Sequence, residues 1–585
     1  MPGPSFWRLI IPGLSIVVAA FSGWQMLQRP LWGYWPWPFF IGLWLATFFL
    51  LGWKNWVNAG HLKYTAASTL SGLLLAAAFP VSPLTFLIFI AWIPLLWLAE
   101  KFKQQKARGS TVFFYAYHAF ALWNLCTTWW VANTAFIAGV VAIFLNSFFM
   151  ASVFWSYYKL QDRLTPFLKL LALPVLWTCF EYLHLNWEIS WPWLNLGNYF
   201  ASRHTWIQWY EFTGTFGGSA WVWSVNMVGW FWINKKTTTK VWDVKLGLSF
   251  LLLVLGPIAL SLVMYTQTSD EGESIKVAVV QPNFEPHFEK FNIPDEGQLP
   301  RFLDLSRQAL NNSVNYLIFP ETSFGNFDVD ELQGYPVYQD LISFLKQYPD
   351  VKLITGLSSY KKYTEDNKPP RDLHERKTTA GMLYFEVQNS AVQIDSGGAN
   401  QLYLKSKFVP GAEIFPYKHL LPFLRPLVNK LGGSMTDWGQ QKDRTPFTQG
   451  KGRVGPIICY ESVYGEYVSG YIHSGANFLA IMTNDGWWDN TPGHKQHAAL
   501  GKLRAIEQRK SIARSANMGI SGFINQRGDL TRINEYGQAQ SGAQEIKANS
   551  KRTFYNQWGD IIARMALFLL FIILLVWGRS FIPKT

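Results

Sequence analysis

The segment VGPIICYES, residues 454–462, is a short apolar run that ends in Cys459, Tyr460 and Glu461. Apolar runs of this length predict strands whose two faces are both buried. Similar runs occur at 275–281, 314–320, 351–357, 381–387, 477–483 and 520–526, and helix candidates lie at 298–312, 335–347, 463–474 and 494–510. Together these elements predict an α/β domain with a covered sheet.

Two other polar residues end strands in the same way. Glu321 closes the run VNYLIFPE, and Lys405 closes the short strand LYLK. Because α/β proteins bind ligands at the carboxyl edge of the sheet, we expect a carboxylate, an ammonium and a thiol to meet there. Glu321 would take the thiol proton, Lys405 would stabilise an oxyanion, and Cys459 would attack a carbonyl to form a thioester. The alternative is a buried cysteine that only packs, beside two solvated surface charges.

The composition excludes an ordinary soluble domain. Of 585 residues, 49% are hydrophobic and only 15% are charged, where a soluble protein has about a quarter charged. Residues 267–560 contain 32 Lys and Arg and 32 Asp and Glu, so the formal net charge of +13 belongs to the apolar remainder. Cytoplasmic loops of membrane proteins collect Lys and Arg, which explains this excess better than a nucleic-acid partner does.

Ten apolar runs are long enough to cross a hydrocarbon core of about 30 Å. They lie near 6–24, 31–53, 64–81, 84–99, 112–131, 134–157, 167–183, 217–234, 245–266 and 562–580. With a cytoplasmic N-terminus, only Arg29, Arg203 and Arg564 among the 19 basic residues of this apolar remainder fall outside. The sixteen on the inside are Arg8, Lys54, Lys63, Lys101, Lys103, Lys106, Arg108, Lys159, Arg163, Lys169, Lys235, Lys236, Lys240, Lys245, Arg579 and Lys584. This asymmetry predicts that residues 267–560 lie across the membrane from the cytoplasm.

We therefore expect four parts. They are an N-terminal extension with two spans (1–63), a transmembrane bundle (64–266), an extramembrane domain (267–560) and a C-terminal span (561–585). We expect the first span to be a retained anchor, since cleavage would leave an odd number of spans. The segment 184–216 is rich in Trp and Tyr and suits the headgroup boundary, as an aromatic belt or a lipid entry. The polar segment 359–379 is expected to be a surface insertion.

Three fragments resemble the Glu, Lys and Cys motifs of the nitrilase superfamily: FPETS (319–323), YLKSKFVPGAEIFP (403–416) and IICYES (457–462). With their flanking spans they look like the bacterial apolipoprotein N-acyltransferase family. Further matches are VAVVQPN (277–283), TNDGWW (483–488) and WPWLNLG (191–197). The resemblance runs from about residue 66 to the end of the chain.

This resemblance implies a multi-pass α-helical membrane bundle that carries an α/β nitrilase-like domain, an αββα sandwich. It implies that Glu321 is the general base, Lys405 the oxyanion stabiliser and Cys459 the acylated nucleophile. The implied reaction moves a fatty acyl group from a phospholipid to the α-amine of a diacylglyceryl-modified lipoprotein. The implied location is a bacterial inner membrane, with the catalytic domain in the periplasm.

The resemblance also implies supporting residues around the triad. Glu413, Tyr460 and Glu461 match further positions that the family needs for activity. Lid or lipid contacts are expected from Trp487, Trp488, Phe288 and Phe291, although Phe288 and Phe291 stand where the family often has a Trp.

Two other functions fit parts of the sequence. A membrane-anchored nitrilase-type amidase would use the same residues but resolve the intermediate with water. A transporter or receptor would need polar residues inside its spans, and only Glu181 comes close. His494 and His497 lack companion ligands at zinc spacing, so we expect no metal and no cofactor. The outer domain has balanced charges, so we expect no nucleic-acid binding, and we expect a monomer.

Overall fold

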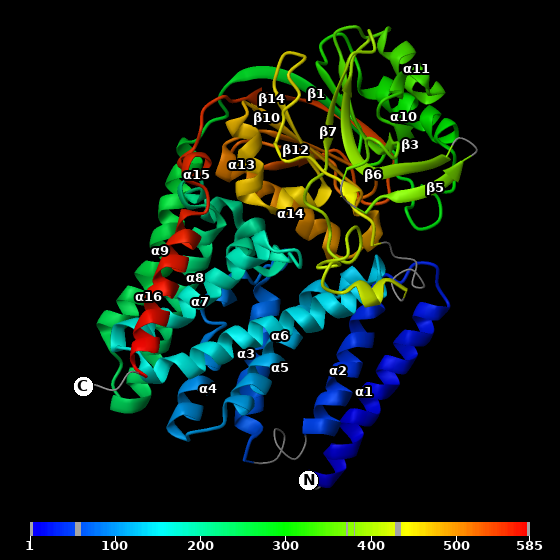
Figure 1. The fold of residues 1–585 in the computed structure, drawn as a ribbon. Coiled ribbons are helices and arrows are strands. Elements are labelled where there is room, and N and C mark those ends of the chain that lie inside the picture. Colours follow the sequence, from blue (N-terminus) through cyan, green and yellow to red (C-terminus); the bar gives the residue numbers. More distant parts are fainter. Residues whose placement is uncertain (1–3, 53–59, 370–371, 379–380, 427–434, 582–585) are drawn as a thin grey trace.

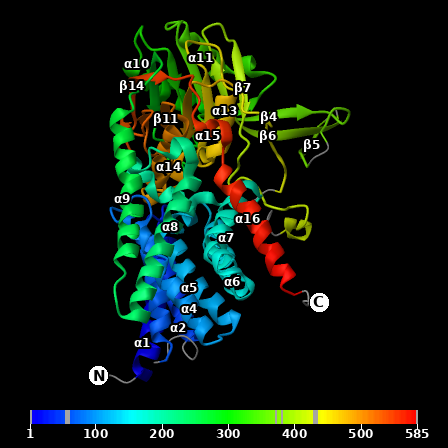
Figure 2. The same ribbon diagram turned by 90° about the vertical axis from the view of Figure 1, so that its left-hand side faces the viewer.

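The computed structural model describes residues 4–52, 60–369, 372–378, 381–426 and 435–581. Lys54, Lys584 and parts of the 359–379 insertion lie outside these residues. The chain forms a helical bundle with a domain of stacked strands on one end of it (Figure 1). The view turned by 90° shows the same two parts, joined by helices α9 and α16 (Figure 2).

Within the described residues, a long helix lies at each of the ten predicted spans. They are α1 (Pro4–Leu27), α2 (Pro36–Gly52), α3 (Leu62–Ala78), η2 with α4 (Thr85–Phe89 and Ile93–Gln104), α5 (Gly109–Thr128), α6 (Phe136–Leu160), α7 (Pro166–Asn186), α8 (Tyr210–Thr239), α9 (Val244–Gln267) and α16 (Ile561–Arg579). Six helical stretches there are long and apolar enough to cross a membrane: Leu9–Leu27, Thr85–Gln104, Phe136–Arg163, Pro166–Asn186, Val244–Gln267 and Ile561–Arg579. Helices α2, α3, α5 and α8 are shorter or less apolar.

The bundle packs through small residues and stacked indoles. Gly72 of α3 meets Ala119 of α5 so closely that a Cβ on Gly72 would lie 2.4 Å from the Ala119 carbonyl oxygen. Such close approach of backbones is how helices associate where water supplies no hydrophobic driving force. In the centre, the ring centroid of Trp92 lies 4.5 Å from those of both Trp177 and Trp223. The bundle therefore has a fixed, densely packed core.

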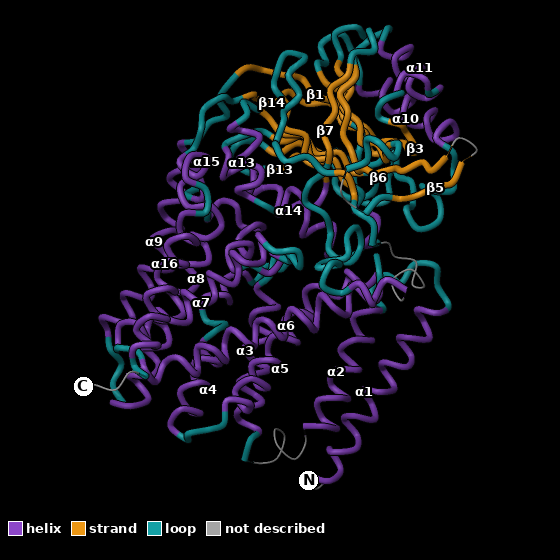
Figure 3. The backbone as a smooth tube through the Cα atoms, viewed as in Figure 1, coloured by secondary structure: helices purple, strands orange, loops and turns teal. Residues whose placement is uncertain are grey.

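The second part contains two sheets (Figure 3). The first has the order β14-β1-β2-β4-β6-β5, with β3 beside β4 and with β7 and β8 beside β6. Its strands are β1 (Glu273–Gln281), β2 (Tyr316–Ile318), β3 (Phe324–Asp328), β4 (Lys352–Tyr363), β5 (His374–Thr378), β6 (Gly381–Ile394), β7 (Asn400–Leu404), β8 (Trp438–Gly439) and β14 (Gln540–Ala548). The second has the order β13-β12-β11-β10-β9, from β9 (Val454–Ile458), β10 (Phe478–Thr483), β11 (Ile512–Ala516), β12 (Gly522–Ile524) and β13 (Leu530–Arg532).

The two sheets stack face to face between two helical layers. Alternate residues of β1 serve different layers: Ile275, Val277 and Val279 join the core between the sheets, whereas Ala278 and Val280 join the core under the outer helices. Those outer helices are α10 (Asp295–Ala309) and α11 (Pro336–Leu345); α13 (Gly465–His473) and α14 (Pro492–Gln508) cover the second sheet. The period-two alternation of a strand buried on both faces produces this arrangement. The predicted αββα sandwich on a helical bundle is confirmed.

Six strands lie outside the predicted runs: β3, β5, β8, β11, β13 and β14. The reason is clear for two of them, and β5 lies in the predicted surface insertion. Strand β11 contains the buried Arg514, and β14 is largely polar, so neither has the apolar pattern of a strand. β14 forms because its backbone pairs with β1 in antiparallel register from Glu273 opposite Ala548. The segment 359–379 contains the end of β4 and the exposed strand β5, which extends the β4–β6 hairpin.

The aromatic segment 184–216 lies between the bundle and the sheets. It forms the short helices η5 (Pro192–Leu194) and η6 (Leu196–Trp206), and Trp193, Tyr199 and Phe200 are fully buried. The Trp and Tyr side chains of this segment are all buried or half-buried within the protein: Trp187, Trp191, Trp193, Tyr199, Trp206, Trp209 and Tyr210. Residues 184–216 therefore lie between the bundle and the second part and contact both; we call them the floor segment.

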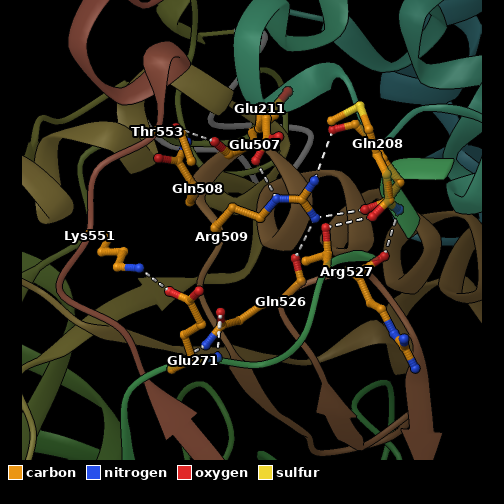
Figure 4. A network of polar contacts seen from close by, with 12 residues as sticks. Gln208, Glu211, Glu271, Glu507, Gln508, Arg509, Gln526, Arg527, Lys551 and Thr553 are labelled. Atoms are coloured by element: carbon orange, nitrogen blue, oxygen red, sulfur yellow. Dashed lines mark hydrogen bonds and ion pairs between the residues drawn. The ribbon is translucent and has the colours of Figure 1, made fainter. Parts of the chain in front are cut away.

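An arginine at the end of α14 fixes this junction. Arg509 adopts the left-handed conformation that ends the helix, with φ 48°. Its guanidinium donates from Nε to Glu211 Oε2 at 2.6 Å, in the first turn of α8, and from NH1 to Gln208 Oε1 at 2.7 Å, just before α8 (Figure 4). It also donates to the carbonyl oxygen of Gln526 at 3.1 Å. One side chain thus joins the bundle, α14 and the second sheet.

The basic residues collect at the end of the bundle away from the sheets. The α4–α5 and α8–α9 connections lie at that end (Figure 1), and they carry Lys106, Arg108 and Lys240. At the α6–α7 connection, the Arg163 guanidinium lies 3.8 Å from the ring centroid of Phe581, just after α16. The start of α1 and the end of α16 also lie away from the sheets (Figure 1).

Candidate functional site

Glu321 lies just beyond the end of β2, at the carboxyl edge of the first sheet. Its side chain is buried, and its Oε1 accepts a hydrogen bond from Asn389 Nδ2 of β6 at 2.8 Å. Gly356 of β4 packs directly beneath it, since a Cβ there would lie 2.7 Å from the Glu321 Cα. The carboxylate is therefore fixed by two neighbouring strands.

Lys405 follows β7 and lies between two carboxylates. Its Nζ is 3.0 Å from Glu321 Oε1 and 2.6 Å from Glu413 Oε1, and the side chain is 1% exposed. The other oxygen of Glu413 accepts from the backbone N–H of Val409 at 2.7 Å. Burial alone would lower the pKa of Lys405, but the negative charges of Glu321 and Glu413 hold that pKa well above its usual value. Lys405 is thus a fixed positive charge.

Cys459 begins the short helix η9 (Cys459–Val463) directly after β9 and has a φ of 48°. This is the left-handed region, which costs a residue with a Cβ of order 1–3 kcal/mol and persists only where the surroundings enforce it. Its carbonyl oxygen accepts from Ser462 Oγ at 2.7 Å and lies 3.3 Å from His497 Nε2. These contacts hold the sharp strand-to-helix turn that presents the sulfur.

The thiol of Cys459 shares its surroundings with the other two groups. Burial raises its pKa well above the usual value, and the charge of Glu321 raises it further. The ammonium of Lys405 and a hydrogen bond with Thr483 act in the opposite direction. The structure therefore brings together the acid, the ammonium and the sulfur that the sequence predicted to meet, with the resting sulfur protonated. They do not share one sheet edge: Glu321 and Lys405 follow strands of the first sheet, whereas Cys459 follows β9 of the second sheet stacked on it.

Glu461 connects the cysteine turn to the lysine loop. This fully buried carboxylate accepts from the backbone N–H of Ile458 at 2.9 Å and from that of Ser406 at 2.8 Å. The hydroxyls of Tyr403 and Tyr467 donate to its Oε1 at 2.8 and 2.5 Å. Four donors on one carboxylate fix the residues before Cys459 and after Lys405 relative to each other.

Tyr460 ties the cysteine turn to the floor segment. Its hydroxyl donates to the backbone carbonyl of Ser190 at 2.9 Å, and Tyr464 donates to the Ser190 hydroxyl at 2.7 Å. The side chain of Tyr460 is buried in the core that the bundle shares with η9 and α14. It therefore anchors the sulfur relative to the bundle.

Sequence reasoning missed a buried charge network behind the cysteine. Asp485 accepts from Arg514 NH2 at 2.7 Å and lies 2.9 Å from His497 Nδ1. Burial would raise the pKa of Asp485, but the charges of Arg514 and His497 hold that pKa well below its usual range. The other ring nitrogen of His497, Nε2, lies 3.3 Å from the Cys459 carbonyl oxygen. Asn389 was also missed, because an amide within an apolar strand gives no local signal.

The four aromatic residues expected at a lid lie in two groups. Trp487 stacks on Phe291 with centroids 5.7 Å apart, and Phe291 and Phe288 are 59% and 50% exposed. Trp488 points the other way, into the junction, with its ring 4.8 Å from Trp130 and 5.5 Å from His497. One group therefore forms an exposed aromatic lip and the other packs behind the cysteine.

The arrangement suits nucleophilic acyl chemistry. It supplies a thiol, a carboxylate that can take its proton, and a fixed cation where an oxyanion would form. Among the residues that the structure describes, no three His, Cys, Asp or Glu side chains cluster closely enough to hold a metal ion.

Comparison with known proteins identifies both parts of the chain. Residues 71–228 match the family model for the apolipoprotein N-acyltransferase N-terminal domain, and residues 276–557 match that for carbon-nitrogen hydrolase. A protein of Chlorobaculum tepidum named apolipoprotein N-acyltransferase is 29% identical over 511 residues, covering 85% of this chain and 93% of that protein. One of the same name from Geobacter metallireducens is 26% identical over 508 residues, covering 85% and 92%. A solved amidase from Nesterenkonia sp. has 14% identity and a TM-score of 0.35, covering 51% of this chain and 97% of that one.

Proposed function

Because this chain belongs to the apolipoprotein N-acyltransferase family, we propose that it transfers a fatty acyl group from a phospholipid to the N-terminal amine of diacylglyceryl-cysteine lipoproteins. The acyl group passes through a thioester on Cys459. The observation that supports this most directly is the buried ammonium of Lys405, held 3.0 Å from Glu321 and electrostatically coupled to the Cys459 sulfur.

The first half-reaction forms the thioester. Glu321 accepts the thiol proton while Sγ attacks the ester carbonyl of the phospholipid, and Lys405 stabilises the negative oxygen of the tetrahedral intermediate. The C–O bond to the glycerol then breaks, and the proton on Glu321 passes to that oxygen. The products are a lysophospholipid and the acylated Cys459.

The second half-reaction reverses these roles. The neutral amine of the lipoprotein attacks the thioester carbonyl and gives a proton to Glu321, while Lys405 again stabilises the oxyanion. The C–S bond breaks, and the sulfur recovers the proton. The products are an amide and the resting thiol, so atoms and charge balance over the cycle.

Two carboxylates support this cycle without bonding to substrate. Glu413 is a second carboxylate on the Lys405 ammonium, at 2.6 Å, and it keeps the ammonium charged and in place. Glu461 fixes the cysteine turn against the lysine loop. The thioester survives between the half-reactions because the floor segment and the covering aromatic residues limit the access of water.

The thioester is tested by incubating the purified protein with phospholipid and mapping its peptides by mass. We expect a fatty acyl adduct on Cys459 and none in Cys459→Ala. Glu321→Gln and Lys405→Met should each slow adduct formation about 10²- to 10³-fold, the usual cost of removing one preorganised group. Absence of the adduct in an active wild-type protein would reject the covalent mechanism.

Hydrolysis of a carbon-nitrogen bond is the second candidate, because residues 276–557 match a carbon-nitrogen hydrolase model. The two activities are separated by comparing release of ammonia from simple amides with acylation of a diacylated lipopeptide. Amide hydrolysis without lipopeptide acylation would favour the amidase.

For the location we propose a bacterial inner membrane, with residues 1–63, 64–266 and 561–585 in or at the bilayer and residues 267–560 in the periplasm. The basic residues at the end of the bundle away from the sheets support this orientation. A reporter fused at the C-terminus should be cytoplasmic, and one inserted at Asn367 should be periplasmic. The reverse labelling would overturn the topology.

A further inference from the structure

Helices α1 and α2 form a hairpin that precedes the segment matched by the N-terminal family model, residues 71–228. The hairpin is closely packed, because a Cβ on Gly42 of α2 would lie 2.6 Å from the Ser15 carbonyl oxygen of α1. None of the triad and supporting residues described above belongs to it. Its contacts nevertheless lead to the turn that carries Trp487 and Trp488.

The hairpin is first anchored halfway along the bundle. Trp44 of α2 donates from Nε1 to His118 Nδ1 at 3.2 Å, and the other ring nitrogen of His118 lies 2.9 Å from Thr69 Oγ1. The ring of Phe40 stacks on that of Phe136 at the start of α6, with centroids 5.6 Å apart. These contacts fix α2 against α3, α5 and α6.

A second anchor lies at the tip of the hairpin, at the end nearer the sheets. The carbonyl oxygen of Gly33, a residue with φ 53°, accepts from Asn133 Nδ2 at 3.0 Å. Next to it, the ring of Tyr34 lies 5.1 Å from that of Trp129. Asn133 and Trp129 are the two ends of the short helix η3 (Trp129–Asn133).

Asn133 connects the hairpin tip to the aromatic turn. The same Nδ2 also donates to the Trp488 carbonyl oxygen at 3.2 Å, and Thr134 Oγ1 donates to that of Trp487 at 3.3 Å. His287 Nε2 donates to the Asn133 carbonyl oxygen at 3.2 Å. Both partners are carbonyl oxygens, which can only accept hydrogen bonds. The side-chain NH₂ group of Asn133, and not its side-chain oxygen, must therefore face them.

The aromatic turn is connected to the candidate site through Asp485. It forms η10 (Asp485–Trp488), which begins at the carboxylate that holds His497 behind Cys459. The ring of Trp488 packs against His497, and that of Trp487 stacks on the exposed lip. Any displacement of this turn therefore moves both the support of the sulfur and one edge of its approach.

We propose that the α1–α2 hairpin is a positioning element of the active site, and that it holds the Trp487–Trp488 turn through Asn133. A single amide nitrogen bridges Gly33 and Trp488, so docking of the hairpin tip adds to the support that Thr134 and Trp130 already give the turn. The consequence for lipid binding rests on the proposed function; the mechanical link does not.

The test uses hydrogen exchange on the full chain in detergent, which needs no substrate. Asn133→Ala removes both hydrogen bonds of the bridge and should speed exchange in residues 484–491 about tenfold, the effect of losing roughly one net hydrogen bond. The matched control is Asn186→Ala, whose exposed amide bonds only the Tyr182 carbonyl on its own helix. It should leave exchange in 484–491 unchanged.

A second variant tests the link from a distance. Trp44→Phe removes the donor to His118 but keeps an aromatic ring, and it touches no residue of the turn; exchange in 484–491 should rise about threefold. Its control is Trp24→Phe, at a ring 54% exposed on α1. If Asn133→Ala or Trp44→Phe speeds exchange only in α2 and η3 and leaves 484–491 unchanged, the positioning role is refuted.

Kinetics then separate this proposal from the function. Asn133→Ala should raise the KM for phospholipid about tenfold with a smaller change in kcat, because the approach is affected more than the triad. A wild-type protein that forms no acyl adduct would refute the proposed function, while the exchange result still decides the role of the hairpin. An unchanged KM in a variant with faster exchange would refute the lipid consequence.

Discussion

Replacing Glu461 by glutamine tests whether one carboxylate aligns the two halves of the site. Four donors converge on its two oxygens: the N–H groups of Ile458 and Ser406 and the hydroxyls of Tyr403 and Tyr467. In glutamine an NH₂ group replaces one oxygen, so at least one donor faces another donor. The variant Glu461→Gln keeps the shape of the side chain and changes only its hydrogen bonding and charge.

The expected cost follows from these contacts. A buried donor without an acceptor costs about 1–3 kcal/mol, and hydrogen bonds that lose their charged partner weaken further, so the total is about 3 kcal/mol. For a domain of this size that lowers the apparent Tm by about 6–12 °C. Because Cys459 and Lys405 would shift relative to each other, adduct formation should slow about 10²-fold.

Two assays check this expectation: thermal unfolding in detergent, and the rate of adduct formation followed by mass. The control Glu375→Gln removes an exposed charge on β5 and should change neither quantity. If Glu461→Gln unfolds within about 2 °C of the wild type, a shift worth less than about 1 kcal/mol, and acylates at the wild-type rate, the assigned alignment role is wrong.

Three further changes probe the surroundings of the site. Gly356→Ala places a Cβ 2.7 Å from the Glu321 Cα, so it should cost about 1–3 kcal/mol by overpacking and slow adduct formation. The pKa of Asp485 is depressed, so its stabilising effect is present above its unfolded pKa of about 3.9 and is lost as the pH falls towards the folded pKa. Asp485→Asn should therefore show a weaker loss of Tm between about pH 5 and about pH 3 than the wild type. Arg509→Lys keeps the charge but loses the fork that joins Glu211, Gln208 and Gln526, and should lower the Tm by about 5 °C.

Each of these variants has a control and a result that would contradict it. Gly325→Ala meets only the Ser358 Cβ at 3.9 Å and should retain activity; equal rates for both glycine variants would contradict the packing argument. If the Tm of Asp485→Asn falls with decreasing pH as steeply as that of the wild type, other carboxyl groups cause the acid sensitivity. Arg527→Lys, at a half-exposed pair with Asp529, should leave the Tm nearly unchanged. If Arg509→Lys and Arg527→Lys have equal Tm values, the Arg509 guanidinium does not stabilise the junction as proposed.

The meeting of Glu321, Lys405 and Cys459 could be predicted from the sequence because each residue follows a predicted strand, and polar residues at strand ends gather where ligands bind. That Cys459 comes from a second sheet stacked on the first could not be predicted. The charge network behind the sulfur could not be predicted either. Arg514 lies within β11, and an arginine within a strand reads as exposed unless its buried partner Asp485 is known. That pairing depends on the contact between β10 and β11, which no local pattern specifies.

The segment 184–216 shows the same limit from the other side. Its tryptophans are equally suited to a lipid boundary and to a junction between two parts of a protein, because each of these environments has an apolar side and a polar side. Only the fold shows that Trp193 donates to Gln496 of α14 at 2.8 Å and is buried. Likewise, the role inferred for α1 and α2 depends on one amide, Asn133, that is far from Trp488 in the sequence.

The protonated state of Cys459 affects more than its activation. The thiolate, not the thiol, attacks peroxides and disulfides, so a sulfur whose pKa is raised by burial and by Glu321 reacts with them slowly. In the oxidising compartment proposed for this domain, we therefore expect the buried thiol of Cys459 to be oxidised more slowly than an exposed cysteine. The other two cysteines, Cys126 and Cys179, belong to the helical bundle, so Cys459 keeps its reactivity for the acyl group that enters the site.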